Sequence, residues 1–151
     1  AVLNFKFHNC CAYAELLSHE MVRSIKDVYR DRKFDLVTCV PMHKDTLRKR
    51  GYNQAELLAK ECARLLGIEY ADLLAKTKKN KTQHSIKAAE RAKNVIGVYS
   101  PIDKNLIKGK RILIIDDIIT TGSTLGECAR ILNKCKCGEI CCCTLCTSLL
   151  I

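Results

Sequence analysis

Apolar residues recur at helical spacing in three stretches of the chain. In the first, residues 13–30, the apolar positions are Leu16, Leu17, Met21, Val22, Ile25 and Val28. The second, residues 53–66, begins at Asn53, a residue type that caps helices with its side chain, and Gly67 ends it. The third covers residues 125–133. Because an apolar face with a period of about 3.6 residues is typical of a surface helix, the sequence predicts three such helices.

Short apolar or alternating runs predict five strands between and after these helices. They cover residues 34–40, 70–74, 95–99, 112–115 and 139–147, and Pro41 stops the first. Residues 77–94 and 101–110 lack periodicity and are predicted to be loops, the first with a helical turn at 88–93. Because strands alternate with helices, we expect an α/β fold with a mainly parallel, doubly wound sheet flanked by helices. A loop as long as 77–94 indicates a flexible lid over a site.

The length and composition are those of an ordinary globular domain. The chain has 151 residues, 48% hydrophobic and 28% charged, which suits one domain, residues 1–151, with a substantial core. No run approaches the length needed to cross a bilayer, and no signal peptide is visible. The sequence starts without Met and in the middle of a pattern, so we expect a fragment or a short form.

The most informative segment is an apolar strand that runs directly into Asp116 and Asp117. Ligands of parallel sheets bind beyond the carboxyl ends of the strands, where these acids fall. A Thr-Thr-Gly-Ser-Thr turn follows and offers a phosphate a glycine, hydroxyl donors and the unpaired amides of a helix start. Since carboxylates repel a bare phosphate, the ligand should also carry hydroxyls, as a ribose 5-phosphate does. An ordinary turn with Ser123 or Thr124 as N-cap would leave both acids unexplained.

A basic segment after the strand at 34–40 supplies a second group of candidates. They are Met42, His43, Lys44, Arg48 and Arg50. We expect a tight basic turn at the same sheet edge as the two acids, a good position for holding a pyrophosphate. His43 is equally well explained as a hydrogen-bonded turn histidine. Arg48 and Arg50 could be surface charges, although Gly51 and the neighbouring helix start favour anion binding.

The net charge of +10 leaves two classes of partner open. A polyanionic small ligand needs a positive basin, and a nucleic acid needs a positive surface. With 5% aromatic residues and no Trp, stacking platforms are scarce, so contacts with single-stranded DNA would be dominated by phosphates. The motifs G-x-x-x-x-G-K-[ST] and G-x-G-x-x-G are both missing, which argues against a P-loop kinase and a dinucleotide-dependent dehydrogenase.

Eleven cysteines are many, yet their spacing is not that of a disulfide-stapled mini-domain. An α/β nucleotide fold instead indicates a reducing cytoplasm. Cys143 and Cys146 have C-x-x-C spacing, which can mark zinc. Residues three apart in the predicted strand 139–147 point to opposite faces, so we interpret these cysteines as small buried hydrophobes and assign no metal ligand directly.

The segment from Asp116 to Thr124 closely resembles the phosphoribosyl pyrophosphate (PRPP) motif of type I phosphoribosyltransferases: an apolar strand, two acids and T-T-G-x-T. Further motifs narrow the resemblance to the ComF family, named for competence in DNA uptake. V-P-x-H, R-x-R-G-Y-N-Q-A, T-Q and R-x-x-N stand in the family's order at residues 40–43, 48–55, 82–83 and 91–94. The resemblance therefore spans nearly the whole chain.

The resemblance implies a type I phosphoribosyltransferase fold with a flexible loop and a hood, and a role for each group of residues. Asp116 and Asp117 would be the catalytic pair that contacts the ribose 2- and 3-hydroxyls. The 5-phosphate would be wrapped by Thr120, Thr121, Gly122, Ser123 and Thr124, largely through backbone amides. The pyrophosphate loop would lie near residues 42–44. The flexible loop, residues 77–94, would close over PRPP with Lys81, Gln83 and Arg91.

Two departures from the family pattern are visible. Members often carry Pro or Arg just after the histidine, where this chain has Lys44, Asp45 and Thr46, and the acid is expected to weaken pyrophosphate binding. Full-length members also carry an N-terminal zinc ribbon, for which the adjacent Cys10 and Cys11 are no substitute. We therefore expect either that the ribbon was cut off or that this is a divergent short form.

The predicted reaction is transfer of phosphoribosyl from PRPP to a nucleobase or amine acceptor, with release of pyrophosphate and with Mg²⁺ bound mainly through PRPP. PRPP is the expected partner. Competence proteins and single-stranded DNA are further candidates, and a homo-oligomer is left open. Two other functions compete with this one: a non-catalytic PRPP- or nucleotide-binding module, and an accessory protein for the uptake of single-stranded DNA.

Overall fold

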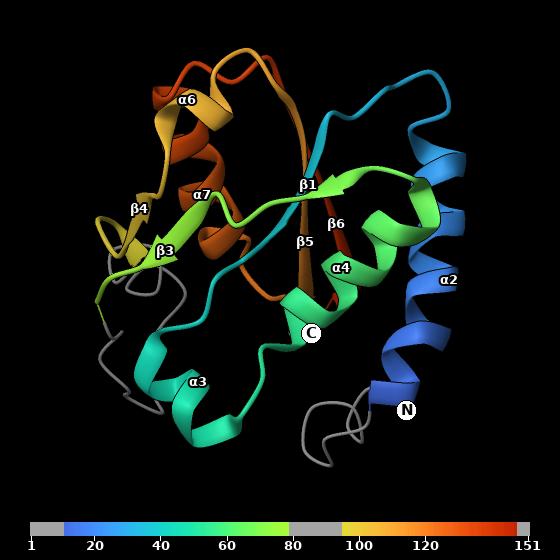
Figure 1. Ribbon diagram of the computed structural model, residues 1–151, viewed down its shortest axis with the longest axis horizontal. Helices are drawn as coiled ribbons and strands as arrows, with labels where there is room; N and C mark the ends of the chain where they lie inside the picture. Colours follow the sequence, from blue (N-terminus) through green and yellow to red (C-terminus); the bar gives the residue numbers. More distant parts are fainter. Residues whose placement is uncertain (1–10, 79–94, 148–151) are drawn as a thin grey trace.

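The computed structural model describes residues 11–78 and 95–147, and its centre is a parallel four-stranded sheet (Figure 1). The strands are β1 (Leu36–Cys39), β2 (Glu69–Tyr70), β5 (Arg111–Ile119) and β6 (Glu139–Thr147), in the order β2-β1-β5-β6. All three neighbouring pairs are parallel. The predicted α/β fold with a mainly parallel sheet is therefore confirmed.

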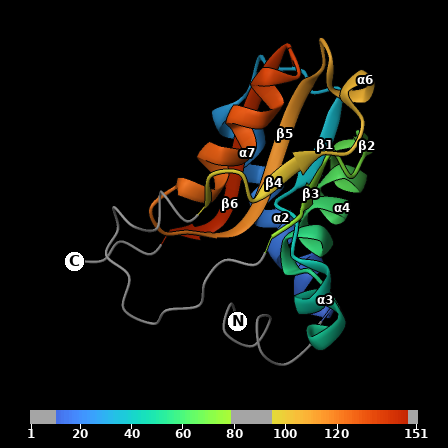
Figure 2. The same ribbon diagram turned by 90° about the vertical axis from the view of Figure 1, so that its left-hand side faces the viewer.

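Helices cover both faces of this sheet, as expected of a doubly wound fold. On one face, α2 (Cys11–Val28) and α4 (Gln54–Leu66) contact β6, β1 and β5. On the other, α7 (Ser123–Lys134) contacts β5 (Figure 2). The predicted ends of α4 are confirmed, because Asn53 caps its start and Gly67, in the left-handed conformation, ends it. No helix within the described ranges is both long and apolar enough to span a membrane.

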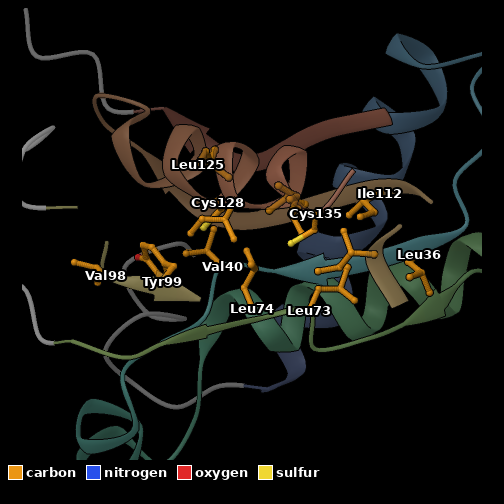
Figure 3. Packing of buried hydrophobic residues seen from close by; sticks show 14 of the residues in the cluster. Leu36, Val40, Leu73, Leu74, Val98, Tyr99, Ile112, Leu125, Cys128 and Cys135 are labelled. Carbon is orange, nitrogen blue, oxygen red and sulfur yellow. The ribbon is translucent and has the colours of Figure 1, made fainter. Parts of the chain in front are cut away.

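The side chains of β5 alternate between two cores. Leu113 and Ile115 belong to the core under α2 and α4, whereas Ile112 and Ile114 belong to the core under α7. All four are completely buried, as expected of a central parallel strand that is covered on both faces. Figure 3 shows the second core, in which Leu125 and Cys128 of α7 lie opposite Val40 and Leu74.

A small antiparallel sheet beside the second core corrects the predictions for two strands. Its strands are β3 (Leu74–Lys76) and β4 (Tyr99–Pro101). The strand predicted at 70–74 is wrong: it merges β2 with β3, which belong to different sheets. The strand predicted at 95–99 is wrong in its bounds, because residues 95–98 form a turn in which the Val98 amide donates to the Val95 carbonyl (3.3 Å). The loop predicted at 101–110 contains the short helix α6 (Lys104–Ile107).

The basic segment after β1 is a helix, α3 (Lys44–Arg50), and the predicted tight turn is wrong. The His43 imidazole caps its start by accepting a hydrogen bond from the Asp45 amide (3.2 Å). Gly51, at a φ of 83°, closes its end. Basic residues in the last turn, Arg48 among them, are favourable there because they face the negative end of the helix dipole. The segment carries no buried residue, so no apolar period marked it as a helix.

A buried carboxylate holds the small sheet's turn against α7. Glu127 is 4% exposed and accepts hydrogen bonds from the Gly97 amide (3.0 Å) and from Arg130 Nε and Nη2 (2.6 and 2.7 Å). The Arg130 hydrogen bonds lower the pKa of Glu127 below its ordinary value of 4.5, against the opposing effect of burial. With these hydrogen bonds the buried Glu127 carboxylate has partners, and it links α7 to the segment that leads into β4.

Replacing this carboxylate should change how stability depends on pH. Because the pKa of Glu127 is lower in the folded than in the unfolded chain, its contribution is complete above pH 4.5 and disappears as pH falls through the folded-state value. Glu127→Gln should therefore lower the free energy of unfolding at pH 7 and flatten its fall on acidification, as measured by urea unfolding at several pH values. Glu20→Gln, at a side chain 72% exposed, is the control and should behave as the wild type. An unchanged acid profile for Glu127→Gln would contradict the linkage.

Candidate functional site

The candidate site lies where β1 and β5 end side by side in the sheet. From β1 the chain leads to β2 on one side, and from β5 it leads to β6 on the other, so the strand order reverses between β1 and β5. Such switch points are where open α/β sheets bind ligands. A cavity of about 330 Å³ opens there, lined by residues that follow β1 and by residues in the second half of β5, and is called the switch-point cavity below.

Asp116 and Asp117 enter the switch-point cavity from the second half of β5. Contrary to expectation, the strand does not end before them but continues to Ile119, paired with β6. Asp116 is 9% exposed, and its Oδ1 accepts a hydrogen bond from the Asp117 amide (2.9 Å). Asp117 Oδ1 accepts in the same way from the Ile118 amide (2.9 Å). These local bonds fix the two carboxylates at the cavity wall.

The turn at residues 120–124 forms a small hollow at the start of α7. Thr120, Gly122, Ser123 and Thr124 line this hollow of about 30 Å³ together with Asp116. Gly122 is the N-cap of the helix, at a φ of 74°, a conformation that glycine adopts without strain. The reading of Ser123 or Thr124 as N-cap is therefore wrong, and α7 begins with a cap that has no side chain to offer its first amides.

Hydroxyl groups complete the rim of this hollow. The hydroxyls of Thr121 and Ser123 are 2.8 Å apart, and Thr121 Oγ1 also accepts a hydrogen bond from the Ser123 amide (3.4 Å). The helix that starts here has twelve residues, so its N-terminal amides present the positive end of a substantial dipole. Amides and hydroxyls together make the hollow chemically suited to an anion with several oxygens.

The basic segment after β1 contributes to the switch-point cavity in part. Met42, His43 and Arg50 line it. Lys44 lies in an adjoining cavity of about 480 Å³, which Met42 and His43 also line. Arg48 lines neither cavity; its side chain is 77% exposed and lies 3.9 Å from the Asp45 carboxylate. The geometry therefore brings four of the five predicted residues to the two cavities and leaves Arg48 on the surface.

His43 has the hydrogen bond of a turn histidine and lines the cavities as well. Its side chain is 11% exposed, and its Nδ1 accepts from the Asp45 amide. With Nδ1 as acceptor, the neutral ring carries its proton on Nε2, which is left as a donor. His43 can therefore be both a hydrogen-bonded turn histidine and a residue of the site.

Two buried polar residues of the site were not predicted as site residues. Asn53, 7% exposed, donates from Nδ2 to the Val40 carbonyl (3.1 Å) while its Oδ1 caps α4 through the Ala55 amide (3.2 Å). Gln54, 2% exposed, also lines the switch-point cavity. Both belong to the R-x-R-G-Y-N-Q-A motif, whose unbroken polar pair before an apolar helix was the signal available in the sequence.

The small sheet supplies two further residues that sequence reasoning missed. Lys76 and Tyr99, neighbours across β3 and β4, both line the switch-point cavity. The Lys76 ammonium lies 5.6 Å from the centre of the Tyr99 ring, in range for a cation–π contact. Burial lowers the pKa of Lys76, and the nearby Asp116 charge acts in the opposite direction. Burial raises the pKa of Tyr99, whose hydroxyl has a hydrogen bond with the Thr124 side chain. Only the tertiary fold brings these residues to the site, so no local pattern marked them.

Three predicted loop residues, Lys81, Gln83 and Arg91, lie outside the described residues. Cys143 and Cys146 lie in β6 as predicted; Cys143 packs against the core under α2 and α4, and Cys146 Sγ lies 3.8 Å from the Asp117 carbonyl. Residues 11–78 and 95–147 contain no cluster of three or more His, Cys, Asp or Glu side chains that could hold a metal ion.

Comparison with known proteins shows the family of the chain. Residues 52–149 match the phosphoribosyl transferase domain family. The chain is 31% identical to competence protein F of Haemophilus influenzae over 144 residues, which is 92% of this chain and 63% of that protein. It is 30% identical to competence protein ComFC of Streptococcus pneumoniae over 81% of this chain and 49% of that protein. The chain thus spans 63% and 49% of the lengths of these two relatives.

The fold is also that of solved phosphoribosyltransferases. An adenine phosphoribosyltransferase superposes with a TM-score of 0.58 at 16% identity, over 93% of this chain and 73% of that one. At such low identity the likeness concerns the fold alone. The predicted type I phosphoribosyltransferase fold and the predicted resemblance to ComF proteins are both confirmed. The chain belongs to the phosphoribosyl transferase domain family, and it is similar to competence protein F and competence protein ComFC.

Proposed function

We propose that the chain binds PRPP in the switch-point cavity and transfers its phosphoribosyl group to an acceptor. One observation carries this proposal: two carboxylates, a helix-start anion hollow and a basic rim meet at a single sheet edge. PRPP has a matching order of groups, since its ribose hydroxyls lie between a 5-phosphate and a pyrophosphate.

The ribose and its phosphate fit the β5 side of the cavity. Asp116 and Asp117 can each accept a hydrogen bond from a ribose hydroxyl, and the fixed orientation of both carboxylates favours a bidentate grip. The hollow at residues 120–124 adjoins Asp116 and would take the 5-phosphate through helix-start amides and hydroxyls.

The pyrophosphate would lie against the wall that the basic side chains form. His43, Arg50 and Lys76 line the switch-point cavity, and Lys44 lies just beyond in the adjoining cavity. Cationic donors at close range stabilise the charge of the diphosphate. The exposed Arg48, whose nearest carboxylate is Asp45, is not assigned to this wall.

In this proposal Mg²⁺ is bound mainly by PRPP. Mg²⁺ prefers oxygen ligands and keeps several waters, so diphosphate oxygens with Asp116 or Asp117 nearby suit it better than a cage of protein side chains. When bound, the ion would neutralise charge on the leaving pyrophosphate. The residues of this chain would position the ribose beside it.

In the proposed reaction the bond from the anomeric carbon to the pyrophosphate oxygen breaks, and a bond to an acceptor nitrogen forms. The electron pair of the broken bond leaves with pyrophosphate, and the acceptor nitrogen loses a proton to solvent. Positive charge develops on the ribose ring, where the carboxylates of Asp116 and Asp117 stabilise it, while Lys76 and Arg50 stabilise the departing diphosphate. Holding the reactants in line contributes the rest.

The acceptor is proposed only by class, as a nucleobase or an amine. The adjoining cavity of about 480 Å³ shares Met42, His43 and Lys76 with the switch-point cavity and offers room for such a molecule. The similarity to competence protein F leads us to propose a role alongside DNA uptake. We further propose a cytoplasmic location, since nine cysteines of the described ranges are free thiols, which suits a reducing compartment.

Loss of one carboxylate should weaken PRPP binding. Asp116→Asn removes the negative acceptor of a ribose hydroxyl, so PRPP affinity with Mg²⁺ should fall by roughly tenfold or more in a calorimetric titration. The matched control is Asp103→Asn at the start of α6, where Asn caps a helix as well as Asp does and PRPP affinity should not change. Equal affinity in wild type and Asp116→Asn would refute the proposed site.

A second prediction concerns Lys76, the half-buried lysine of the small sheet. Lys76→Met keeps the length of the side chain and removes its charge, so PRPP should bind about tenfold more weakly while ribose 5-phosphate binds as in the wild type. Lys78→Met, at an exposed position two residues along, is the control and should leave both affinities unaltered. A parallel loss of ribose 5-phosphate affinity would show that Lys76 supports the fold of the site rather than the diphosphate.

The catalytic step has its own test, because a non-catalytic PRPP-binding module would bind PRPP in the same way. Pyrophosphate release should appear when wild-type protein, PRPP and Mg²⁺ meet a panel of nucleobases and amines, and Asp116→Asn should abolish it. PRPP binding without release across the panel would favour the binding module, for which Asp45 beside the proposed pyrophosphate wall is the supporting observation.

A further inference from the structure

A further cavity opens at the opposite edge of the sheet from the proposed PRPP site. Its volume is about 470 Å³, and it lies among the end of α2, the loop before β1, the end of α4 and the start of β5. In Figure 1 this edge is at the top of the view, whereas α3 and the carboxyl end of β5 are toward the bottom. The PRPP proposal makes no use of this cavity, called the basic cavity below.

Cationic side chains dominate its polar lining: Lys26, Arg30, Arg32, Lys33 and Arg111. Two of them have partners within the fold. Arg111 grips Asp35 with Nε (3.0 Å) and Nη2 (2.6 Å), and Arg32 forms an ion pair with Glu139. For Lys26, Arg30 and Lys33 no ion pair with a carboxylate occurs within residues 11–78 and 95–147. Three exposed cations around one cavity are thus available to an anion.

The floor of the basic cavity is apolar and partly aromatic. Tyr29 and Phe34 both line it, with ring centres 5.8 Å apart and planes at 86°. The Tyr29 hydroxyl donates to the Cys142 carbonyl (2.9 Å), which anchors this ring to β6. The Arg32 guanidinium lies over the Tyr29 ring, 6.0 Å from the ring centre. The aromatic pair is therefore held by contacts on several sides and keeps its shape without a ligand.

We propose that the basic cavity binds a nucleotide, with its base against the aromatic floor and its phosphate at Lys26, Arg30 and Lys33. An aromatic, apolar floor with a few converging polar groups is the usual composition of a small-molecule site, and the volume falls in the usual range. A simple anion would not account for the aromatic floor, and an uncharged aromatic molecule would not account for the cations. A nucleotide unites both kinds of group in one ligand.

The nucleotide can come from two sources. A free mononucleotide would fill the cavity alone. A single nucleic-acid strand would place one of its nucleotides there and leave the neighbouring nucleotides outside the cavity. The chemistry at the cavity is the same, so the proposal covers both, and binding experiments separate them.

The test compares charge reversal inside and outside the basic cavity. The variant Lys26→Glu/Arg30→Glu/Lys33→Glu changes three exposed side chains of the cavity, and the control Lys104→Glu/Lys108→Glu/Lys134→Glu changes three exposed lysines outside it. Adenosine monophosphate, an oligothymidylate of roughly twelve nucleotides and inorganic phosphate are each titrated into both variants and the wild type, with binding followed by nuclear magnetic resonance. Thermal unfolding confirms that the variants are folded. All three proteins also carry Asp116→Asn, which disables the proposed PRPP site.

Affinity for at least one nucleotide probe should fall by roughly tenfold or more in the cavity variant, change far less in the control, and exceed the affinity for inorganic phosphate. Loss of mononucleotide binding assigns the site to free nucleotides, and loss of oligothymidylate binding alone assigns it to a strand. If no nucleotide probe binds, if the control loses as much affinity as the cavity variant, or if phosphate binds as tightly as the nucleotides, the proposal is wrong. Because Asp116→Asn leaves this site intact, failure here is independent of failure at the PRPP site.

Discussion

The parallel pairing of β1 with β5 is the constraint on which the candidate site depends. It aligns Cys39 with Ile115, so both strands deliver their following segments to the same edge of the sheet. Complete burial of the four apolar residues 112–115 holds β5 in this register, because a slip by one residue would turn its two sets of side chains into the opposite cores. Hydrophobic packing in the centre thereby fixes the position of Asp116 at the edge.

One buried amide then couples this edge to the rest of the fold. Asn53 binds the Val40 carbonyl just after β1 and caps α4, whose apolar face contacts both β1 and β5. Unpaired buried polar groups are costly, so both ends of this side chain stabilise a single geometry of the loop. The loop in question carries Met42 and His43, which face the cavity shared with the acids. Rigidity of the site therefore arises from the helix start as much as from the sheet.

Elements that depend on residues close together in the sequence were predicted correctly. Elements that depend on contacts between distant segments were missed. Helix periodicity, Asn53 and Gly67 located α4, and the apolar run located β5, since these signals act within a few residues. By contrast, β3 and β4 are three-residue strands whose pairing needs residues far apart in the chain, and they carry Lys76 and Tyr99 into the site. Helix α3 was not predicted, because none of its residues is buried and it therefore has no apolar periodicity. Its ends are marked by the caps His43 and Gly51.

The two acids of β5 show why a departure from local preference can mark a site. Asp is disfavoured within strands, yet Asp116 and Asp117 stand inside one that stays paired through Ile119. Asp116 is almost buried, which is unfavourable for a carboxylate, and the hydrogen bond from the Asp117 amide offsets part of that cost. The completely buried apolar residues 112–115 hold the strand that carries it in place. A strand this strongly anchored can hold a carboxylate where a ligand needs it, and that is the physical reason to look for function at its end.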